Sequence, residues 1–188
     1  MFDGSKLPLE ENIAFTRQVV KAAREAGASV EAELGRIGGT EDEVSVADRE
    51  AFFTDPEEAR YFVERTEVDA LAVAVGTAHG RYKGEPKLDL ERLARIAGLV
   101  GIPLVLHGAS GVPDGAVREA IKRGVRKINI DTDIRQRFIE TVRCRLHEEP
   151  AEIDPRKILG PAREAAVEVV REKIRLFGSS KKAGRGSF

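Results

Sequence analysis

The chain has 188 residues, enough for one domain with a hydrophobic core. Hydrophobic residues make up 41% and charged residues 34% of it, as in ordinary soluble globular proteins. A net charge of -1 gives no general attraction to nucleic acid or to an anionic membrane, and a single cysteine, Cys144, excludes an internal disulfide. We therefore expect neither nucleic acid nor membranes among its partners.

The N-terminal sequence and the cysteine usage together predict a cytoplasmic protein. The first residues, MFDGSKLPLEEN, show neither the basic region nor the apolar segment of a signal peptide. The longest mainly apolar run, residues 70–78, is far shorter than the roughly 20 residues that span a bilayer. One unpaired cysteine fits a reducing compartment.

Helical and extended patterns alternate along the chain. The clearest helix start is Asp55-Pro56-Glu57-Glu58, where a capping residue precedes proline and two acidic residues. We predict helices at residues 8–26, 54–66, 88–99, 113–123, 132–147 and 154–177, with a break at Pro150. Strands are predicted at residues 28–34, 69–75, 102–107 and 125–130.

This alternation indicates βαβ units and a parallel sheet. Four such units are half of an eight-stranded barrel, for which a typical chain has ~250 residues. We find no internal repeat and no second domain, so residues 1–178 are expected to form one partial barrel domain. The polar, glycine-containing residues 179–188 are expected to form a flexible tail.

Polar residues follow the carboxyl ends of the predicted strands. Glu33, His79, His107 and the pair Asn129 and Asp131 lie at or just past these ends. Because parallel strands end on the same side of a sheet, where barrel enzymes carry their active sites, these residues should converge in space.

The histidines and glutamates in this set suggest a metal site. A single histidine at a strand end can equally be a hydrogen-bonded core residue, but His79 and His107 occupy the same place in successive βα units. Glu31 and Glu33 alternate with apolar neighbours, so both should point into the barrel interior and need cationic or metal partners. Two imidazoles with Glu33, the glutamate nearer the strand end, would suit zinc.

Two short turns suggest a phosphate site beside that metal. In HGASG, residues 107–111, small side chains let backbone N–H groups approach an anion, and Ser110 adds a hydroxyl. Asn129, Asp131 and Thr132 of the sequence NIDT could bind further phosphate or hydroxyl oxygens, and Lys83 could supply positive charge. The alternative for each glycine-containing segment is a plain tight turn.

Taken together, these motifs resemble the zinc-dependent, class II ketose-bisphosphate aldolases, a family that acts on fructose and tagatose bisphosphates. The matching segments run in order from Asp3 to Arg135: DGSKLPLEENIAFTRQVV, VEAELGRIGGTEDEV, TDPEEARYFVERTEVDALAVAVGTAHGRYKGEPKLDLERL, IPLVLHGASGVP and KINIDTDIR. The resemblance covers the C-terminal two-thirds of the family's length.

The resemblance implies an α/β fold, a (β/α)8 TIM barrel that is here incomplete, with about the last four to five βα units and the C-terminal helices. It implies zinc-dependent, reversible cleavage of a ketose bisphosphate to dihydroxyacetone phosphate and glyceraldehyde 3-phosphate. His79 and His107 match zinc ligands, Glu33 matches a glutamate that can approach the metal, and Glu41 matches a residue proposed to move a proton.

The resemblance also implies the substrate site and the partners. The positions that match binding residues for dihydroxyacetone phosphate are Gly80, Gly108, Ala109, Ser110, Asn129, Ile130, Asp131 and Thr132. Lys83 matches a position near the phosphate and near a monovalent cation, Na+ or K+. Family members commonly form homodimers or homotetramers, so we expect self-association or a complementing N-terminal half.

The chain departs from the family pattern in one large respect. It begins where the family has the end of its fourth strand, which we interpret as a truncation, a misplaced start or one half of a split gene. The Asp-His-Gly motif, which supplies the family with a proton donor and a third histidine ligand, does not occur in the 188 residues. One alternative is therefore a catalytically incompetent half barrel that acts as a phosphate-binding or assembly subunit. The second alternative is a lysine-dependent aldolase that uses Lys127.

Overall fold

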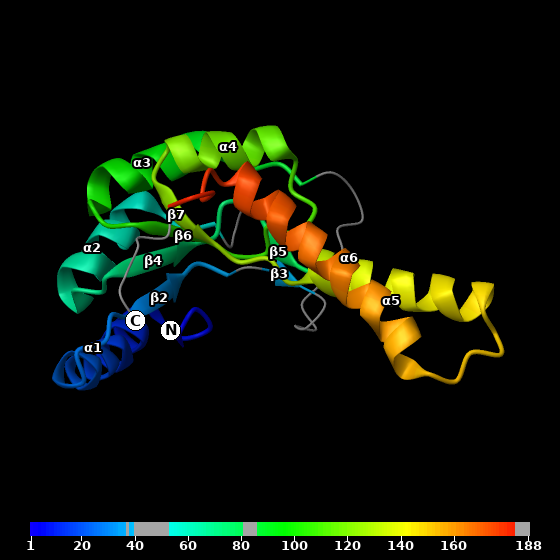
Figure 1. Cartoon of the computed structure of the whole chain (residues 1–188). Helices are drawn as coiled ribbons and strands as arrows, with labels where there is room; N and C mark the ends of the chain where they lie inside the picture. The colour runs from blue at the N-terminus through cyan, green and yellow to red at the C-terminus, as the bar shows by residue number, and fades with distance from the viewer. Residues whose placement is uncertain (37, 40–52, 81–85, 183–188) are drawn as a thin grey trace. The chain divides into compact units, whose positions relative to one another are not determined.

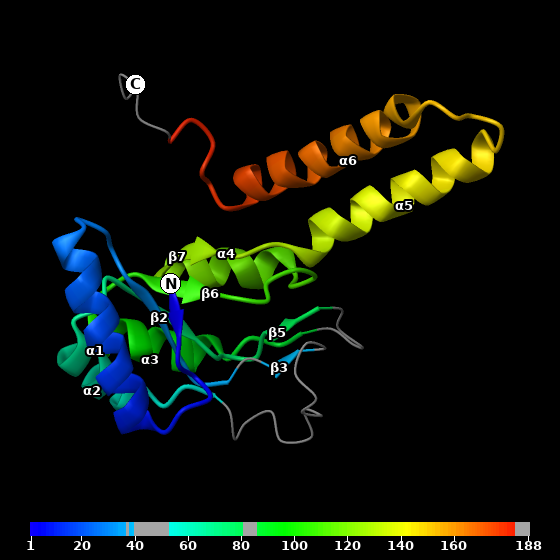
Figure 2. The same cartoon turned by 90° about the horizontal axis from the view of Figure 1, so that it is seen from below.

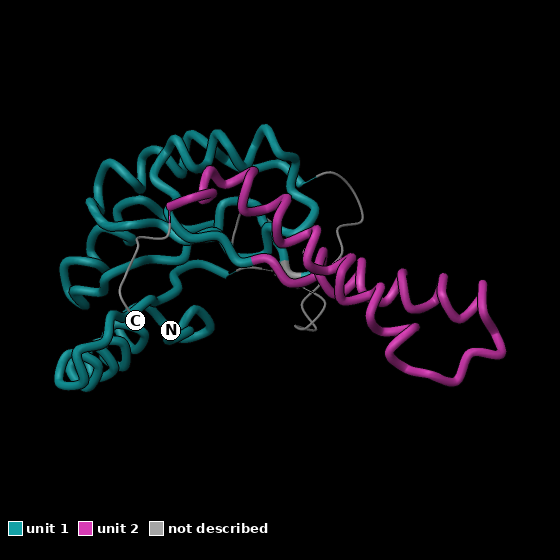
Figure 3. Tube along the Cα trace, in the orientation of Figure 1, with its two compact units in different colours: residues 1–129 teal, residues 130–188 magenta. Residues whose placement is uncertain are grey.

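The computed structural model describes residues 1–36, 38–39, 53–80 and 86–182 (Figure 1). The chain divides into two compact units: unit 1 contains residues 1–129, and unit 2 contains residues 130–188 (Figure 3). Unit 1 holds the sheet and the helices that cover it, and unit 2 holds a pair of helices. The single domain expected over residues 1–178 stays a prediction, because a compact unit need not fold independently.

Unit 1 is built on a parallel sheet with the strand order β1-β2-β4-β6-β7. Its strands are β1 (Phe2–Asp3), β2 (Glu31–Leu34), β4 (Ala70–Val73), β6 (Leu104–Leu106) and β7 (Val125–Ile128). Past the ends of β2 and β4, two short strands, β3 (Gly38–Gly39) and β5 (Ala78–His79), pair with each other in parallel. The four predicted strands are confirmed, whereas the two-residue strands β1, β3 and β5 are too short to leave a hydrophobic pattern.

Four helices alternate with these strands, as the sequence predicted. They are α1 (Leu9–Glu25), α2 (Pro56–Thr66), α3 (Leu90–Val100) and α4 (Asp114–Lys122). Each packs against the next, and together they follow the strands around the outside of the sheet (Figure 1). The result is a run of βα units around an open five-stranded sheet, which is part of a TIM-barrel arrangement.

The centre of unit 1 is buried on both faces of the sheet. Every residue from Leu71 to Val73 in β4 and from Leu104 to Leu106 in β6 is completely inaccessible to solvent. The side chains of Phe62, Leu93 and Ile96 from α2 and α3 are equally inaccessible. Such two-sided burial explains why these strands read as continuous apolar runs rather than as alternating patterns.

Unit 2 consists of α5 (Thr132–Glu148) and α6 (Pro155–Leu176), which pack against each other and are joined by a short turn (Figure 2). An ion pair of 2.7 Å between Lys173 Nζ and Asp133 Oδ2 links the end of α6 to the start of α5, so the helices are antiparallel. The predicted break near Pro150 is confirmed. No helix within the described residue ranges is long and apolar enough to cross a membrane.

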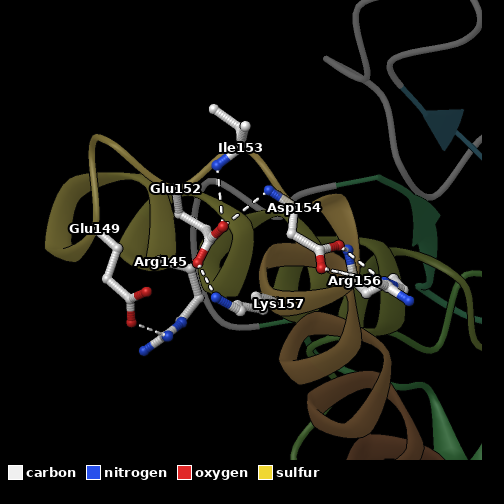
Figure 4. A network of polar contacts seen from close by, with 7 residues as sticks. All are labelled: Arg145, Glu149, Glu152, Ile153, Asp154, Arg156 and Lys157. Atoms are coloured by element: carbon white, nitrogen blue, oxygen red, sulfur yellow. Dashed lines mark hydrogen bonds and ion pairs between the residues drawn. The ribbon is translucent and has the colours of Figure 1, made fainter.

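Charged side chains tie the turn between α5 and α6 together (Figure 4). One oxygen of Glu152 accepts hydrogen bonds from the backbone N–H groups of Ile153 and Asp154, and the other pairs with Lys157 at 2.6 Å. Asp154 caps α6 by accepting from the Arg156 N–H, and Arg145 pairs with Glu149. We call the charged residues shown in Figure 4, namely Arg145, Glu149, Glu152, Asp154, Arg156 and Lys157, the turn network.

Candidate functional site

The register of the sheet places four titratable side chains on one face. Glu33 pairs laterally with Ala72, Ala72 with Val105, and Val105 with Lys127, so these residues form one row across four strands. Because side chains alternate along a strand, residues two positions away share that face. Glu31 and His107 therefore lie on the same face as Glu33 and Lys127.

These four residues form a continuous chain of contacts, which we call the sheet-face cluster. His107 lies between the glutamates: its Nε2 is 3.0 Å from Glu31 Oε1, and its Nδ1 is 2.8 Å from Glu33 Oε2. The second oxygen of Glu31 pairs with Lys127 Nζ at 2.7 Å. Each glutamate predicted to need a partner therefore has one: Glu31 contacts His107 and Lys127, and Glu33 contacts His107.

The same contacts show that the sheet is strongly curved toward this face. Lys127 on β7 and Glu31 on β2 are separated by β4 and β6, which is a distance of about 14 Å in a flat sheet with its ordinary strand spacing. Their side chains nevertheless meet at 2.7 Å. The cluster therefore lies on the concave side of the sheet, the side that faces the interior in a TIM barrel.

Burial and charge act against each other in the cluster. The side chains of His107 and Glu33 are each 4% exposed, and that of Glu31 is 11% exposed. Burial by itself would lower the pKa of His107, but the hydrogen bonds and charges of Glu33 and Glu31 outweigh it and raise the pKa above 6.5. Burial would raise the pKa of Glu31, but Lys127 and His107 lower it below 4.5.

Buried polar groups on α1 fix the backbone beneath the cluster. Asn12, 1% exposed, donates through Nδ2 to the backbone oxygen of Glu33 at 3.1 Å. The Thr16 hydroxyl donates in turn to Asn12 Oδ1 at 3.1 Å. Leu34, the next residue along β2, accepts a 2.5 Å hydrogen bond from the buried Thr54 hydroxyl, which also accepts from the Ala74 N–H of the segment after β4.

The glycine-containing turn after His107 brings small side chains to the same end of the sheet. Gly108 has a φ of 60°, a conformation that favours glycine, and buried Ala109 and Ser110 follow it before α4 begins. Asn129 lies alongside, because its N–H donates to the Leu106 oxygen at 3.0 Å. Gly108, Ala109, Ser110 and Asn129 are thus brought together next to His107.

Other predicted site residues are placed less completely. His79 lies in β5, paired with Gly39, and Gly80 follows it with a φ of 91°. Thr77, two residues before His79, is 7% exposed, and its hydroxyl has no hydrogen-bond partner within the described residues. Such a hydroxyl is available to a ligand. Glu41 and Lys83 lie outside the described residues.

Ile130, Asp131 and Thr132 belong to unit 2, at the start of α5. Asp131 precedes the helix and pairs with Arg135 at 2.8 Å, and Thr132 is its first residue. Their predicted part in substrate binding stays a prediction.

The geometry at the strand ends agrees with comparisons to known proteins. Residues 1–182 match the family described as fructose-bisphosphate aldolase class-II. The chain belongs to this family. A curated relative from Thermus caldophilus, named fructose-bisphosphate aldolase, is 50% identical, and the match covers 95% of the chain and 66% of the relative.

Solved aldolase structures have the same fold. The YdjI aldolase from Escherichia coli K12 is 39% identical with a TM-score of 0.78, and the match covers 96% of the chain and 61% of that protein. A putative fructose-1,6-bisphosphate aldolase from Coccidioides immitis is 33% identical with a TM-score of 0.83, over 97% of the chain and 63% of that protein. The chain spans less than two thirds of the length of each of these relatives.

Class II aldolases are generally zinc-dependent, and the donor chemistry of the cluster fits this metal in part. Imidazole nitrogen and carboxylate oxygen are both zinc ligands, and His107 Nδ1 and Glu33 Oε2 face each other at a hydrogen-bond distance of 2.8 Å. Within the described residues, no group of three His, Cys, Asp or Glu side chains could hold a metal ion, so a further ligand is needed.

Sequence reasoning missed two parts of the site. The sequence suggested Lys127 only as a Schiff-base lysine, whereas in the structure its Nζ forms an ion pair with Glu31 at 2.7 Å. Asn12 was not predicted to be part of the site. It could have been found as a polar residue on the buried face of α1, where Asn12, Thr16 and Val20 follow one another at intervals of four residues.

Proposed function

We propose that this chain is the zinc-binding part of a class II aldolase that reversibly cleaves fructose 1,6-bisphosphate or tagatose 1,6-bisphosphate to dihydroxyacetone phosphate and glyceraldehyde 3-phosphate. The observation that carries the proposal is the position of His107. It lies just past the end of β6, is buried between two glutamates of β2 and is followed directly by the small-residue turn at Gly108. Metal ligation and phosphate binding would thus meet in one short segment.

In this proposal, His79, His107 and Glu33 hold zinc. Bound zinc would polarise the substrate ketone and stabilise the negative charge that develops on its oxygen. The chain's own residues orient the substrate: Gly108, Ala109 and Ser110 bind the phosphate of dihydroxyacetone phosphate, and Asn129 binds beside them. The remaining proposed substrate residues are Gly80, Lys83, Ile130, Asp131 and Thr132, with a Na+ or K+ ion near Lys83.

Glu41 is the proposed group that moves the proton at the carbon next to the ketone. A glutamate suits this task because its carboxylate can accept a proton once the substrate is held nearby. Glu41 follows Gly38 and Gly39 of β3 in the sequence, and β3 pairs with the strand that contains His79.

The edges of the sheet bear on the assembly. Within the described residues, β1 and β7 each have a strand on one side only, and unpaired strand edges favour association. We propose a cytoplasmic protein that forms a homo-oligomer or joins a complementing N-terminal half. The second candidate function is a phosphate-binding or assembly subunit without turnover, and the small-residue turn beside His107 supports its phosphate site.

The test is aldol cleavage of both bisphosphates by the purified 188-residue chain, with added zinc and then with a chelator. Zinc-dependent turnover that disappears with the chelator supports the aldolase. Stoichiometric binding of zinc and dihydroxyacetone phosphate without turnover supports the second candidate. A folded chain that binds neither contradicts both.

A further inference from the structure

Glu31 and Lys127 have no role in the function proposed above, yet Glu31 contacts the proposed zinc ligand His107, and Lys127 contacts Glu31. Each oxygen of Glu31 is engaged, Oε1 with His107 Nε2 at 3.0 Å and Oε2 with Lys127 Nζ at 2.7 Å. We infer that Lys127 and Glu31 form a positioning pair that keeps a proton on Nε2 of His107 and leaves Nδ1 as the zinc-binding nitrogen. This inference rests on the proposed function.

Distances alone do not distinguish the two nitrogens of His107. Nδ1 lies 2.8 Å from Glu33 Oε2 and Nε2 lies 3.0 Å from Glu31 Oε1, and both values are ordinary hydrogen-bond distances. The same ring could therefore hold zinc on either side if the carboxylates were equivalent.

The carboxylates differ in their charge partners. Glu31 is already paired with the Lys127 ammonium, so a zinc ion on Nε2 would lie close to a like charge. Across the described residues, the Glu33 carboxylate is paired with His107 and with no Lys or Arg side chain. Repulsion by the Lys127 ammonium disfavours zinc on the Glu31 side, and no such ammonium is paired with the carboxylate on the Nδ1 side.

The remaining contact then has the form expected of a metal-bound histidine. Such a histidine usually donates its other N–H to a carboxylate, which fixes the tautomer and the orientation of the ring. Glu31 is well suited to receive that N–H, because it is 11% exposed and Lys127 holds it from the other side. Lys127 itself is half exposed, so its contribution is its charge rather than its packing.

The pair is tested by finding which nitrogen of His107 carries zinc in the 188-residue chain. Long-range proton–nitrogen correlation spectra of the zinc-loaded chain should show Nδ1 bound to the metal and Nε2 protonated. In Lys127→Met, the Glu31 carboxylate loses its partner and competes for zinc, so a second population with zinc on Nε2 should appear. Lys127→Arg keeps the charge and should retain the wild-type spectrum.

Zinc affinity, measured by competition with a chelator, supplies a second readout. Glu31→Gln removes the charged acceptor for Nε2–H and should weaken zinc binding about 10- to 100-fold, as loss of such a partner does in other zinc sites. Lys122→Met is the matched control, because Lys122 is 71% exposed and pairs with Glu119 on α4. It should leave both readouts unchanged.

The outcomes separate the two proposals. Zinc on Nε2 in the wild-type chain, or wild-type affinity in Glu31→Gln together with an unchanged spectrum in Lys127→Met, overturns the positioning pair and leaves the proposed function standing. A folded wild-type chain whose His107 signals do not respond to zinc overturns both. If Lys127→Met fails to fold, Glu31→Gln decides the question alone, and wild-type zinc affinity in that variant overturns the positioning pair.

Discussion

The sheet-face cluster and the turn network use the same kinds of side chain in opposite surroundings. In the cluster, His107 and Glu33 are each 4% exposed and meet at 2.8 Å. In the turn network, Arg156 is 88% exposed and pairs with Asp154 at the same distance. A contact distance therefore says little about energy, because the consequence of losing a partner depends on whether water can replace it.

Double-mutant cycles test most directly whether the buried pair contributes more to stability than the exposed one. For the buried pair, we expect Glu33→Gln, His107→Leu and the double variant to give a coupling of about 1–3 kcal/mol in the free energy of unfolding, because each single variant leaves a buried polar group without its partner. The same cycle on Arg156 and Asp154 should give a coupling below about 0.5 kcal/mol, because Arg156 is 88% exposed. Urea unfolding followed by circular dichroism measures both, and equal couplings would contradict the distinction.

The backbone support of the cluster provides the next largest effect. Asn12→Leu leaves the Glu33 backbone oxygen and the Thr16 hydroxyl without their described partners, so it should lower the free energy of unfolding by about 2 kcal/mol. Gln18→Leu, on the exposed face of the same helix, is the control and should change it by less than about 0.5 kcal/mol. A similar result for the two variants would mean that water replaces Asn12.

An intermediate case is Asp89, the N-cap of α3. Its carboxylate is 33% exposed and accepts from the Arg92 N–H and Arg92 Nε. Burial would raise its pKa, but these bonds and the arginine charge hold the pKa below 3.8. At neutral pH, Asp89→Ala should cost about 1 kcal/mol of stability.

That contribution should depend on pH in one direction. Because the folded pKa lies below the unfolded one, the stabilisation is present above pH 3.8 and is lost as the pH falls through the folded value. Unfolding curves of wild type and Asp89→Ala should therefore converge in acid, between about pH 4 and pH 2. Curves that stay equally far apart would assign the effect to geometry rather than charge.

The smallest effect belongs to the turn network. Arg156→Ala should leave the midpoint of thermal unfolding unchanged within error, because its guanidinium is surrounded by water. At about 1 M salt, where surface charges are screened within a few ångströms, any residual difference should vanish. A clear, salt-resistant loss of stability would show that the turn behaves like the buried cluster.

The sequence by itself determined the alternating elements, the buried strands and the identity of the residues at the strand ends. Hydrophobic periodicity and helix caps act over a few residues, so they can be recognised without knowledge of the fold. The predicted N-cap Asp55, for example, accepts hydrogen bonds from the backbone N–H groups of Glu57 and Glu58. The sequence also showed that Glu31 and Glu33 share a face and need partners.

Only the tertiary structure decided which partners those are. Lys127 is 96 residues from Glu31 in the chain, and the two meet because the curved sheet brings β7 toward β2. Asn12 supports Glu33 because α1 packs beside β2. No local pattern encodes such contacts, since they depend on strand order and curvature, and these are set by the packing of the whole unit.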